Sequence, residues 1–249
     1  MPISLENKII NKLKGFYRVK TVYPLHEPLI EKDDQKNILN SVKSTYVSTV
    51  GPLIGKFELE IAKYCKSKYA VATNSGTSAL HLSLLALGIK KNDEVLVPAF
   101  TFVGTVNSIA YCGAIPHFID SSIEKKGKDV DKLEIYLKSI LVKKGKFIYN
   151  KNSGNKIKAI IPVHIFGHPC EIDKVLVLAK KYNLIVLEDA AESLGSTYKN
   201  KHCGTFGNVG CLSFNGNKII TAGSGGAVLT NSKKIATKIK HLSMVAKKK

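Results

Sequence analysis

The chain has 249 residues, which is long enough to bury a sizeable hydrophobic core. Its 38 basic and 19 acidic residues give a net charge of +19, yet Arg18 is the only arginine and the lysines are spread along the whole chain. Proteins that read phosphates or bases specifically rely on arginine forks, so we expect no specific nucleic-acid partner. Nonspecific binding of polyanions at low salt stays an alternative.

The cysteines and the apolar segments indicate the cellular compartment. The five cysteines are odd in number and form no CxxC pair, which is typical of a reduced compartment. Lysines interrupt every apolar run near the N-terminus, and no segment approaches about 18 uninterrupted apolar residues. We therefore expect a cytoplasmic protein with no signal peptide and no membrane partner.

The first 65 residues contain helical patterns. Residues 1–25 are basic and weakly amphipathic, which predicts an N-terminal arm or a short helix. Residues 31–45 and 52–65 carry apolar side chains at helical spacing, and Gly51 with Pro52 marks the start of the second segment. Both segments are predicted to be helices that pack on the body of the protein.

Residues 69–88 predict a strand, a polar turn and a helix. The strand is YAVAT at 69–73, the turn is 74–77, and the helix at 78–87 is closed by Gly88. The unpaired N–H groups and the positive dipole end at such a helix start are suited to a phosphate. The alternative is that Thr77 or Ser78 only caps the helix.

The alternation of strands and helices continues to residue 189. A strand ends at Pro98, a helix occupies 103–112, and another strand ends at Asp120. Residues 121–158 are lysine-rich and predict an excursion from the core, with a helix at 131–143 and a polar loop at 150–156. Strand 159–164, helix 172–182 and strand 184–188 follow. This order predicts an α/β three-layer sandwich around a mostly parallel sheet, whose ligands bind at the carboxyl ends of the strands.

Lys218 stands in the stretch CLSFNGNKIITAGSGG and is the only charged side chain between Cys203 and Ser232. Its neighbours Ser213, Phe214, Asn215, Ile219 and Ile220 predict a partly desolvated amine, and such an amine can form a Schiff base. A surface lysine beside a glycine-rich turn is the alternative.

Asp189 ends an apolar strand, where a carboxylate needs a cation or strong donors. A protonated pyridine nitrogen is such a partner. Pyridoxal phosphate (PLP) requires this aspartate, a Schiff-base lysine and a phosphate cradle, and the candidates are Asp189, Lys218 and the turn NSGTS. The alternative for Asp189 is a helix cap.

Six motifs resemble one known family in their order. They are TNSGTSALHL, VPAFTFVGTVNSI, GAIPHFID, VHIFGHPCEID, EDAAESLGS and SFNGNKIITAGSGG. Over roughly residues 22–244 the chain resembles the DegT/StrS-type nucleotide-sugar aminotransferases, which are fold-type I PLP-dependent enzymes. The resemblance implies a PLP-binding large domain at 26–244, flanked by the arm at 1–25 and a lysine tail at 245–249. Members continue into a smaller C-terminal domain, which we expect this chain to lack.

The resemblance also implies roles for individual residues. Lys218 would be the Schiff-base lysine and Asp189 the pyridinium partner, and both are the expected catalytic residues. Phe102, which follows a strand end, would stack on the cofactor. Position 192 is Glu where many members have Gln or His, and position 215 is Asn where others have His. The complete expected cofactor-binding set is Gly76, Thr77, Ser78, Phe102, Asp189, Glu192, Ser213, Asn215 and Lys218.

The implied reaction moves an amino group from a donor such as glutamate to a keto group of a nucleotide-linked sugar, within a homodimer. The segment STVGPLIGKFE is most similar to members acting on UDP-linked 4-keto-6-deoxy amino sugars. One alternative is a PLP-binding protein without transaminase activity. Another is a metal site at His164, His168 and Cys170, which we do not expect because Gly167 and Pro169 prevent a helix that would align the histidines.

Overall fold

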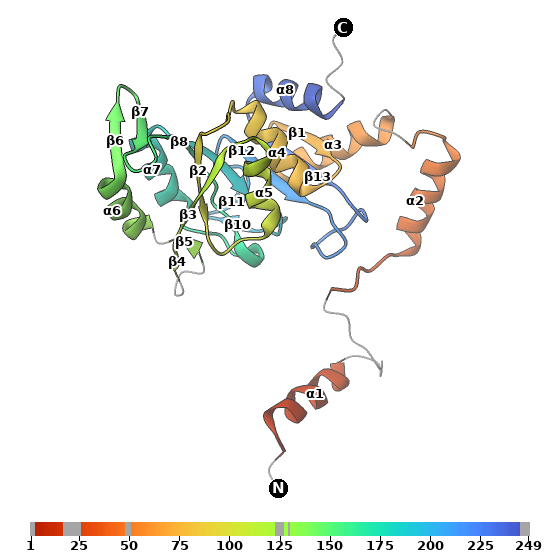
Figure 1. Cartoon of the computed structure of the whole chain (residues 1–249). Coiled ribbons are helices and arrows are strands. Elements are labelled where there is room, and N and C mark those ends of the chain that lie inside the picture. Colours follow the sequence, from red (N-terminus) through yellow and green to blue (C-terminus); the bar gives the residue numbers. More distant parts are fainter. Residues whose placement is uncertain (1–2, 17–25, 48–50, 123–126, 129, 245–249) are drawn as a thin grey trace.

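A computed structural model describes residues 3–16, 26–47, 51–122, 127–128 and 130–244. Two helices, α1 (Leu5–Phe16) and α2 (Lys32–Lys43), lie apart from the body of the chain, and neither buries a residue (Figure 1). The prediction that the segment 31–45 packs on the body is therefore wrong. The rest of the N-terminal arm and the lysine tail at 245–249 lie outside the described residues.

Nine of the described strands form one sheet, whose main path has the order β1-β13-β12-β9-β8-β2-β3, and the other four form two small two-stranded sheets. Strand β13 is antiparallel to both of its neighbours, whereas β12, β9, β8, β2 and β3 pair in parallel. The predicted mostly parallel sheet is confirmed. The path strands are β1 (Tyr69–Thr73), β2 (Glu94–Pro98), β3 (Ile115–Ile119), β8 (Lys156–Ile160), β9 (Ile185–Asp189), β12 (Val209–Ser213) and β13 (Gly226–Thr230).

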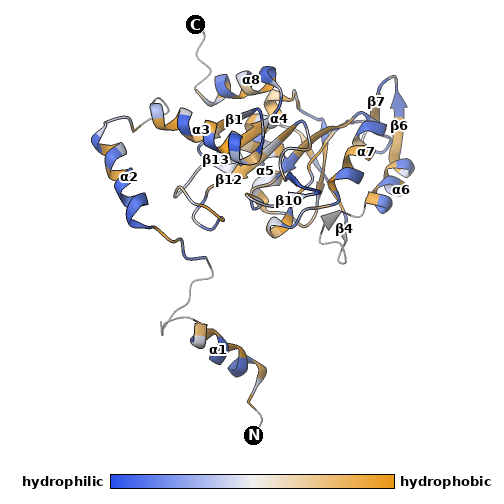
Figure 2. Cartoon of the chain, turned by 180° about the vertical axis from the view of Figure 1, so that it is seen from behind, coloured by the Kyte–Doolittle hydropathy of each residue, from blue (hydrophilic) through white to orange (hydrophobic). Residues whose placement is uncertain are grey.

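Helices cover both faces of this sheet, which gives the predicted three layers. On one face, the helices α4 (Gly76–Ala86), α5 (Val103–Tyr111) and α8 (Lys233–Ser243) contribute to one core cluster. The helices α3 (Pro52–Cys65), α6 (Val130–Ile140) and α7 (Ile172–Tyr182) pack against the other face in two further clusters. The central strands are predominantly hydrophobic, as Figure 2 shows.

Alternation along each strand divides its side chains between the two faces. In β2, Val95 and Val97 belong to the cluster under α4, whereas Leu96 belongs to the cluster under α6 and α7. All five residues of β2 are buried. A strand buried on both faces needs a continuous apolar run, and this explains why EVLVP reads as a strand in the sequence.

The lysine-rich region after β3 is not an excursion from the core, contrary to our expectation. Helix α6 ends at Ile140 rather than at 143, and it buries Val130, Leu133 and Leu137 against the sheet. A strand then follows directly and pairs with the next one, which joins the sheet beside β8. The short strands here and downstream are β4 (Ser121–Ser122), β5 (Gly127–Lys128), β6 (Leu141–Lys144), β7 (Phe147–Asn150), β10 (Thr197–Tyr198) and β11 (Lys201–His202).

Some other elements have bounds that differ from the predicted ones by a few residues. Helix α4 begins at Gly76 instead of 78, and Ser75 caps it by accepting the N–H of Ser78 at 3.0 Å. Strand β8 occupies Lys156–Ile160 rather than 159–164. Helices α3 and α7 have the predicted bounds. No helix in the described ranges is both long and apolar enough to cross a bilayer.

We predict that replacing Leu84 with alanine destabilises the fold. Leu84 is fully buried in the cluster between α4 and the sheet, so its truncation removes apolar contacts and leaves a cavity. The free energy of unfolding should fall by about 2–5 kcal/mol, measured by urea unfolding. The matched control is Leu59→Ala in α3, whose side chain is 73% exposed and whose loss should cost about 0.5 kcal/mol or less. Equal effects of the two substitutions would contradict the assigned core.

Candidate active site

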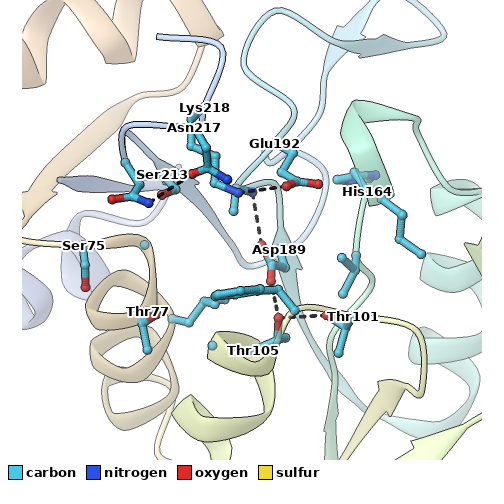
Figure 3. A pocket seen from close by; sticks show the side chains of 18 of the residues that line it. Ser75, Thr77, Thr101, Thr105, His164, Asp189, Glu192, Ser213, Asn217 and Lys218 are labelled. Carbon is cyan, nitrogen blue, oxygen red and sulfur yellow. Dashed lines mark hydrogen bonds and ion pairs between the residues drawn. The ribbon is translucent and has the colours of Figure 1, made fainter. Parts of the chain in front are cut away.

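A cavity of about 500 Å³ is lined by residues that follow the carboxyl ends of several strands. Its walls come from the start of α4, the turn after β2, the segment after β8, the end of β9 and the loop after β12. This confirms the convergence expected of a parallel sheet. Figure 3 shows the site. Its polar and charged lining residues are Ser75, Thr77, Thr101, Thr105, His164, Asp189, Glu192, Ser213, Asn215, Asn217, Lys218 and Ser224.

Asp189 lies at the inner wall of the cavity as the last residue of β9 and is only 5% exposed. Its Oδ2 accepts the hydroxyl of Thr105 at 2.7 Å, and its Oδ1 accepts the N–H of Ala191 at 3.1 Å. Burial raises the pKa of Asp189 above the ordinary 3.8, although these two donors and the charge of Lys218 act in the opposite direction. No helix follows directly, so Asp189 is not a helix cap.

A pair of threonines orients the Asp189 carboxylate. The hydroxyls of Thr101 and Thr105 lie 2.9 Å apart, and Thr105 donates its single hydrogen to Asp189. The Thr101 hydroxyl must therefore be the donor to Thr105. Thr105 itself is buried in the first turn of α5, so this short chain of hydrogen bonds fixes Asp189 from the helix side.

Lys218 also lines the cavity, and in the view of Figure 3 Asp189 lies between it and Thr105. Its side chain is 13% exposed, and its Nζ lies 2.8 Å from Oε1 of Glu192. The prediction of a partly desolvated lysine is confirmed. Two of the apolar neighbours expected from the sequence do not shield the Lys218 amine from solvent, because Ile219 and Ile220 are themselves 62% and 58% exposed.

The loop that carries Lys218 joins the antiparallel strands β12 and β13. Its base is closed by Phe214, whose N–H donates to Gly225 and whose carbonyl accepts the N–H of Ala222, both at 2.9 Å. A turn inside the loop lets the Lys218 N–H donate to the carbonyl of Asn215 at 3.0 Å. The lysine therefore projects from a loop that is closed at its base and ordered by a turn.

The start of α4 forms the remaining wall. Gly76 and Thr77 occupy its first turn, where backbone N–H groups have no intrahelical partner. A Cβ on Gly76 would lie 2.8 Å from Cβ of Ser213, and one on Gly104 would lie 2.7 Å from Oγ1 of Thr77. Glycine at both positions therefore permits the close packing at this corner of the cavity, and the helix dipole makes the corner suited to an anion.

The structure brings together all but one of the residues predicted from the sequence. Phe102, Asn215 and Glu192 line the cavity together with the residues described above. The Phe102 side chain is 73% exposed, so it is not a core residue. Ser78 is not among the lining residues, because its N–H and its Oγ both bond to Oγ of the capping Ser75.

Behind the cavity, a buried carboxylate supports the wall that contains His164. The Nδ1 of His164 accepts the N–H of Cys170 at 3.3 Å, so Nε2 carries the ring hydrogen and donates to Glu188 at 3.1 Å. Glu188 also accepts the N–H groups of Gly204, Phe206 and Gly207. Both nitrogens of His164 are thus engaged. Across the described part of the chain, no group of three or more His, Cys, Asp or Glu side chains is placed to hold a metal ion.

Sequence reasoning did not identify several lining residues as part of the site. Thr101, Thr105 and Asn217 carry polar side chains inside it, and Phe100 and Phe166 are 58% and 75% exposed aromatic rings beside it. Thr101 lies in the turn after β2 and Thr105 in the first turn of the next helix, so the rule of strand ends that selected Phe102 could also have selected them. Nothing in the local sequence marks Phe166, which has a left-handed φ of 51°.

The residues present fit PLP. The buried Asp189 carboxylate, with its raised pKa, suits a ring nitrogen that must stay protonated. The Lys218 amine, whose side chain is 13% exposed, lines the same cavity. The corner at Gly76 and Thr77 presents the first-turn N–H groups of α4, which suit a phosphate.

Comparisons with known proteins identify the family of the chain. The family model of the DegT/DnrJ/EryC1/StrS aminotransferase family matches residues 28–249. The chain is 40% identical over 215 residues to the GDP-perosamine synthase of Caulobacter vibrioides, covering 86% of this chain and 54% of that protein. It is 41% identical over 218 residues to the GDP-perosamine synthase of Escherichia coli O157:H7, covering 88% and 56%.

Solved structures give the same result. The X-ray structure of the aminotransferase from Psychrobacter cryohalolentis superposes with a TM-score of 0.76 at 33% identity, covering 87% of this chain and 51% of that one. The fold is therefore that of the fold-type I large domain, as predicted. The chain spans about half the length of the curated relatives it matches.

We predict that Asp189 gives the cofactor-free protein a distinctive pH dependence. Its pKa is 3.8 ordinarily and higher in the folded chain, so its stabilising contribution is complete below pH 3.8 and is lost as the pH rises through the folded value. The difference in free energy of unfolding between the wild type and Asp189→Asn should become less favourable to the wild type as the pH rises from about 3.5 to about 7. Urea unfolding at a series of pH values measures this.

The control residue, Asp173, should give the opposite pH dependence of stability. Hydrogen bonds from Lys199 and Tyr198 lower the pKa of Asp173 to about 2, so its contribution is present above pH 3.8 and is lost as the pH falls toward 2. The stability of the wild type relative to Asp173→Asn should therefore fall on acidification. A relative stability that rises with pH for Asp189 would contradict the assignment.

Proposed function

Because the chain belongs to the DegT/DnrJ/EryC1/StrS aminotransferase family, we propose that it binds PLP and transfers an amino group to a keto group of a nucleotide-linked sugar. The observation that carries the proposal is that Lys218 and Asp189 line one cavity together with a helix N-terminus. Members of the family are PLP-dependent, and the chemistry of the lining residues supports the same cofactor here.

PLP, when bound, supplies an aldehyde that accepts an amino group and a pyridinium ring that withdraws electrons. In this proposal the Asp189 carboxylate keeps a proton on the ring nitrogen, and Thr105 and Ala191 hold that carboxylate in place. Gly76, Thr77 and Ser213 bind the phosphate, since they surround the corner at the start of α4. Phe102 packs on the ring.

Lys218 has two roles in the proposed reaction. Its amine would hold the cofactor covalently at rest, and as a free amine it would act as the base that carries a proton at the reacting carbon. Lys218 suits this because it is 13% exposed and therefore partly shielded from water. Glutamate is the proposed amino donor. His164, Phe166 and Asn217 also line the cavity and are left to contact the sugar.

The names of the relatives order the substrates to be tested. Three of them are GDP-perosamine synthases, which are 40%, 41% and 38% identical to this chain. A GDP-linked 4-keto-6-deoxy sugar is therefore the first candidate acceptor, ahead of the UDP-linked sugars indicated by the sequence resemblance. The PLP-binding unit is proposed to be residues 26–244, preceded by the N-terminal arm.

A homodimer is the proposed assembly. Five large apolar side chains are strongly exposed in the two loops and the turn around the cavity mouth, and a second copy that covered them would also shield the site from water. They are Phe100, Phe102, Phe166, Ile219 and Ile220. Sedimentation equilibrium should give twice the mass of the chain, and Ile220→Lys should weaken the association. A monomer at all concentrations would contradict the proposal.

We predict that the purified chain acquires a visible absorption band on mixing with PLP and that Lys218→Ala abolishes it, because the band requires the covalent bond to this amine. The control is Lys240→Ala. Lys240 also forms an ion pair, with Glu58 at 2.6 Å, but lies outside the cavity. A band that survives Lys218→Ala or disappears in Lys240→Ala would contradict the assignment.

The second stage tests amino transfer. Adding glutamate to the PLP-loaded chain should remove the visible band, and a keto sugar should restore it, with the amino sugar detected by mass spectrometry. A GDP-linked and a UDP-linked 4-keto-6-deoxy sugar are compared in parallel. If the band forms but glutamate never removes it, the chain binds the cofactor without acting as a transaminase.

A further inference from the structure

Glu192 joins two loops of the site through both of its carboxylate oxygens. Its Oε1 lies 2.8 Å from Nζ of Lys218, and its Oε2 accepts the N–H of Phe166 at 3.0 Å. Figure 3 shows the carboxylate extending from its loop toward the lysine. Within the described chain, Lys218 is the one cation bonded to Glu192.

The position of Glu192 does not depend on the lysine. Phe166 and Gly167 both have left-handed backbones, with φ of 51° and 79°, and this turns the Phe166 N–H toward Glu192. A Cβ on Gly167 would lie 2.7 Å from the Glu192 carbonyl oxygen, so the main chains of the two loops are also in close contact. The carboxylate therefore stays beside the cavity whether or not Lys218 pairs with it.

Lys218 cannot keep this ion pair and carry the cofactor at once. To react, the ammonium first loses a proton to solvent. The amine nitrogen then bonds to the aldehyde carbon of PLP, and the aldehyde oxygen leaves as water. The three-hydrogen ammonium that Glu192 binds is consumed in this step, and Glu192 keeps only the Phe166 N–H.

We propose that Glu192 is a positioning residue that holds the released Lys218 and so shifts the balance of the site from covalent toward noncovalent cofactor binding. The inference rests on the proposed function. A charge pair present in one state and lost in the other stabilises the first by its own interaction free energy. Because Glu192 is 35% exposed and Lys218 13% exposed, solvent weakens this pair to a factor of about two to five in the equilibrium.

The experiment compares two ligands on Glu192→Gln. PLP must break the ion pair to bond with Lys218, whereas 4′-deoxypyridoxine 5′-phosphate has no aldehyde and leaves the pair intact. Glutamine keeps an oxygen for the Phe166 N–H but presents an N–H group to the lysine. The affinity for PLP relative to the deoxy analogue should rise about two- to fivefold in the variant. Equilibrium dialysis measures both dissociation constants without any catalytic readout.

Glu58→Gln is the matched control. Glu58 Oε1 accepts the N–H of Ala72 at 2.8 Å and Nζ of Lys240 at 2.6 Å, so it has the same kinds of partner outside the cavity. Its substitution should leave the affinity ratio unchanged. If Glu192→Gln does not fold, Glu192→Asp gives the same test, because its shorter carboxylate cannot reach both partners and the ratio should shift in the same direction.

The outcomes separate the two hypotheses. An equal loss of affinity for both ligands in Glu192→Gln would mean that the residue only supports the loop, and an unchanged ratio would mean that the ion pair has no influence; either result overturns the inference while the proposed function stands. If the wild type binds neither ligand, the proposed function fails and the inference fails with it.

Discussion

The buried carboxylate of Asp189 is the constraint on which the site depends. A carboxylate at the end of a central strand is removed from water, which raises its pKa and favours a positively charged ligand group beside it. Two neutral donors, Thr105 and Ala191, hold its oxygens without satisfying the need for a cation. The fold thus carries a local cost that a bound pyridinium would offset.

The parallel sheet explains why the other groups lie near this carboxylate. Strands β12, β9, β8 and β2 run in the same direction, so the segments that leave their carboxyl ends meet along one edge. The antiparallel strand β13 then returns the chain beside β12, and the connecting loop brings Lys218 back over the same edge. One reversal of strand direction thus brings the amine into the same cavity as the carboxylate.

Local patterns were sufficient for the elements whose burial is uniform. Helices α3 and α7 had the predicted bounds because their apolar spacing and end signals agree, and β2 was identified by its continuous apolar run. The isolation of Lys218 in the sequence and the position of Asp189 after an apolar strand also selected the two central site residues. Helix α2 was misjudged, because an amphipathic pattern predicts a helix but not the surface that would cover it.

The sequence by itself determined the class of fold, the order of its elements and the chemical identity of the lysine and aspartate, because period and composition are local properties of the chain. Only the tertiary structure decided which polar groups meet. The hydrogen bond from Thr105 to Asp189 and the carboxylate bridge from Glu192 to Lys218 and Phe166 join segments that are far apart in the chain. Such contacts depend on how strand ends and loops pack in three dimensions, and no spacing along the chain encodes them.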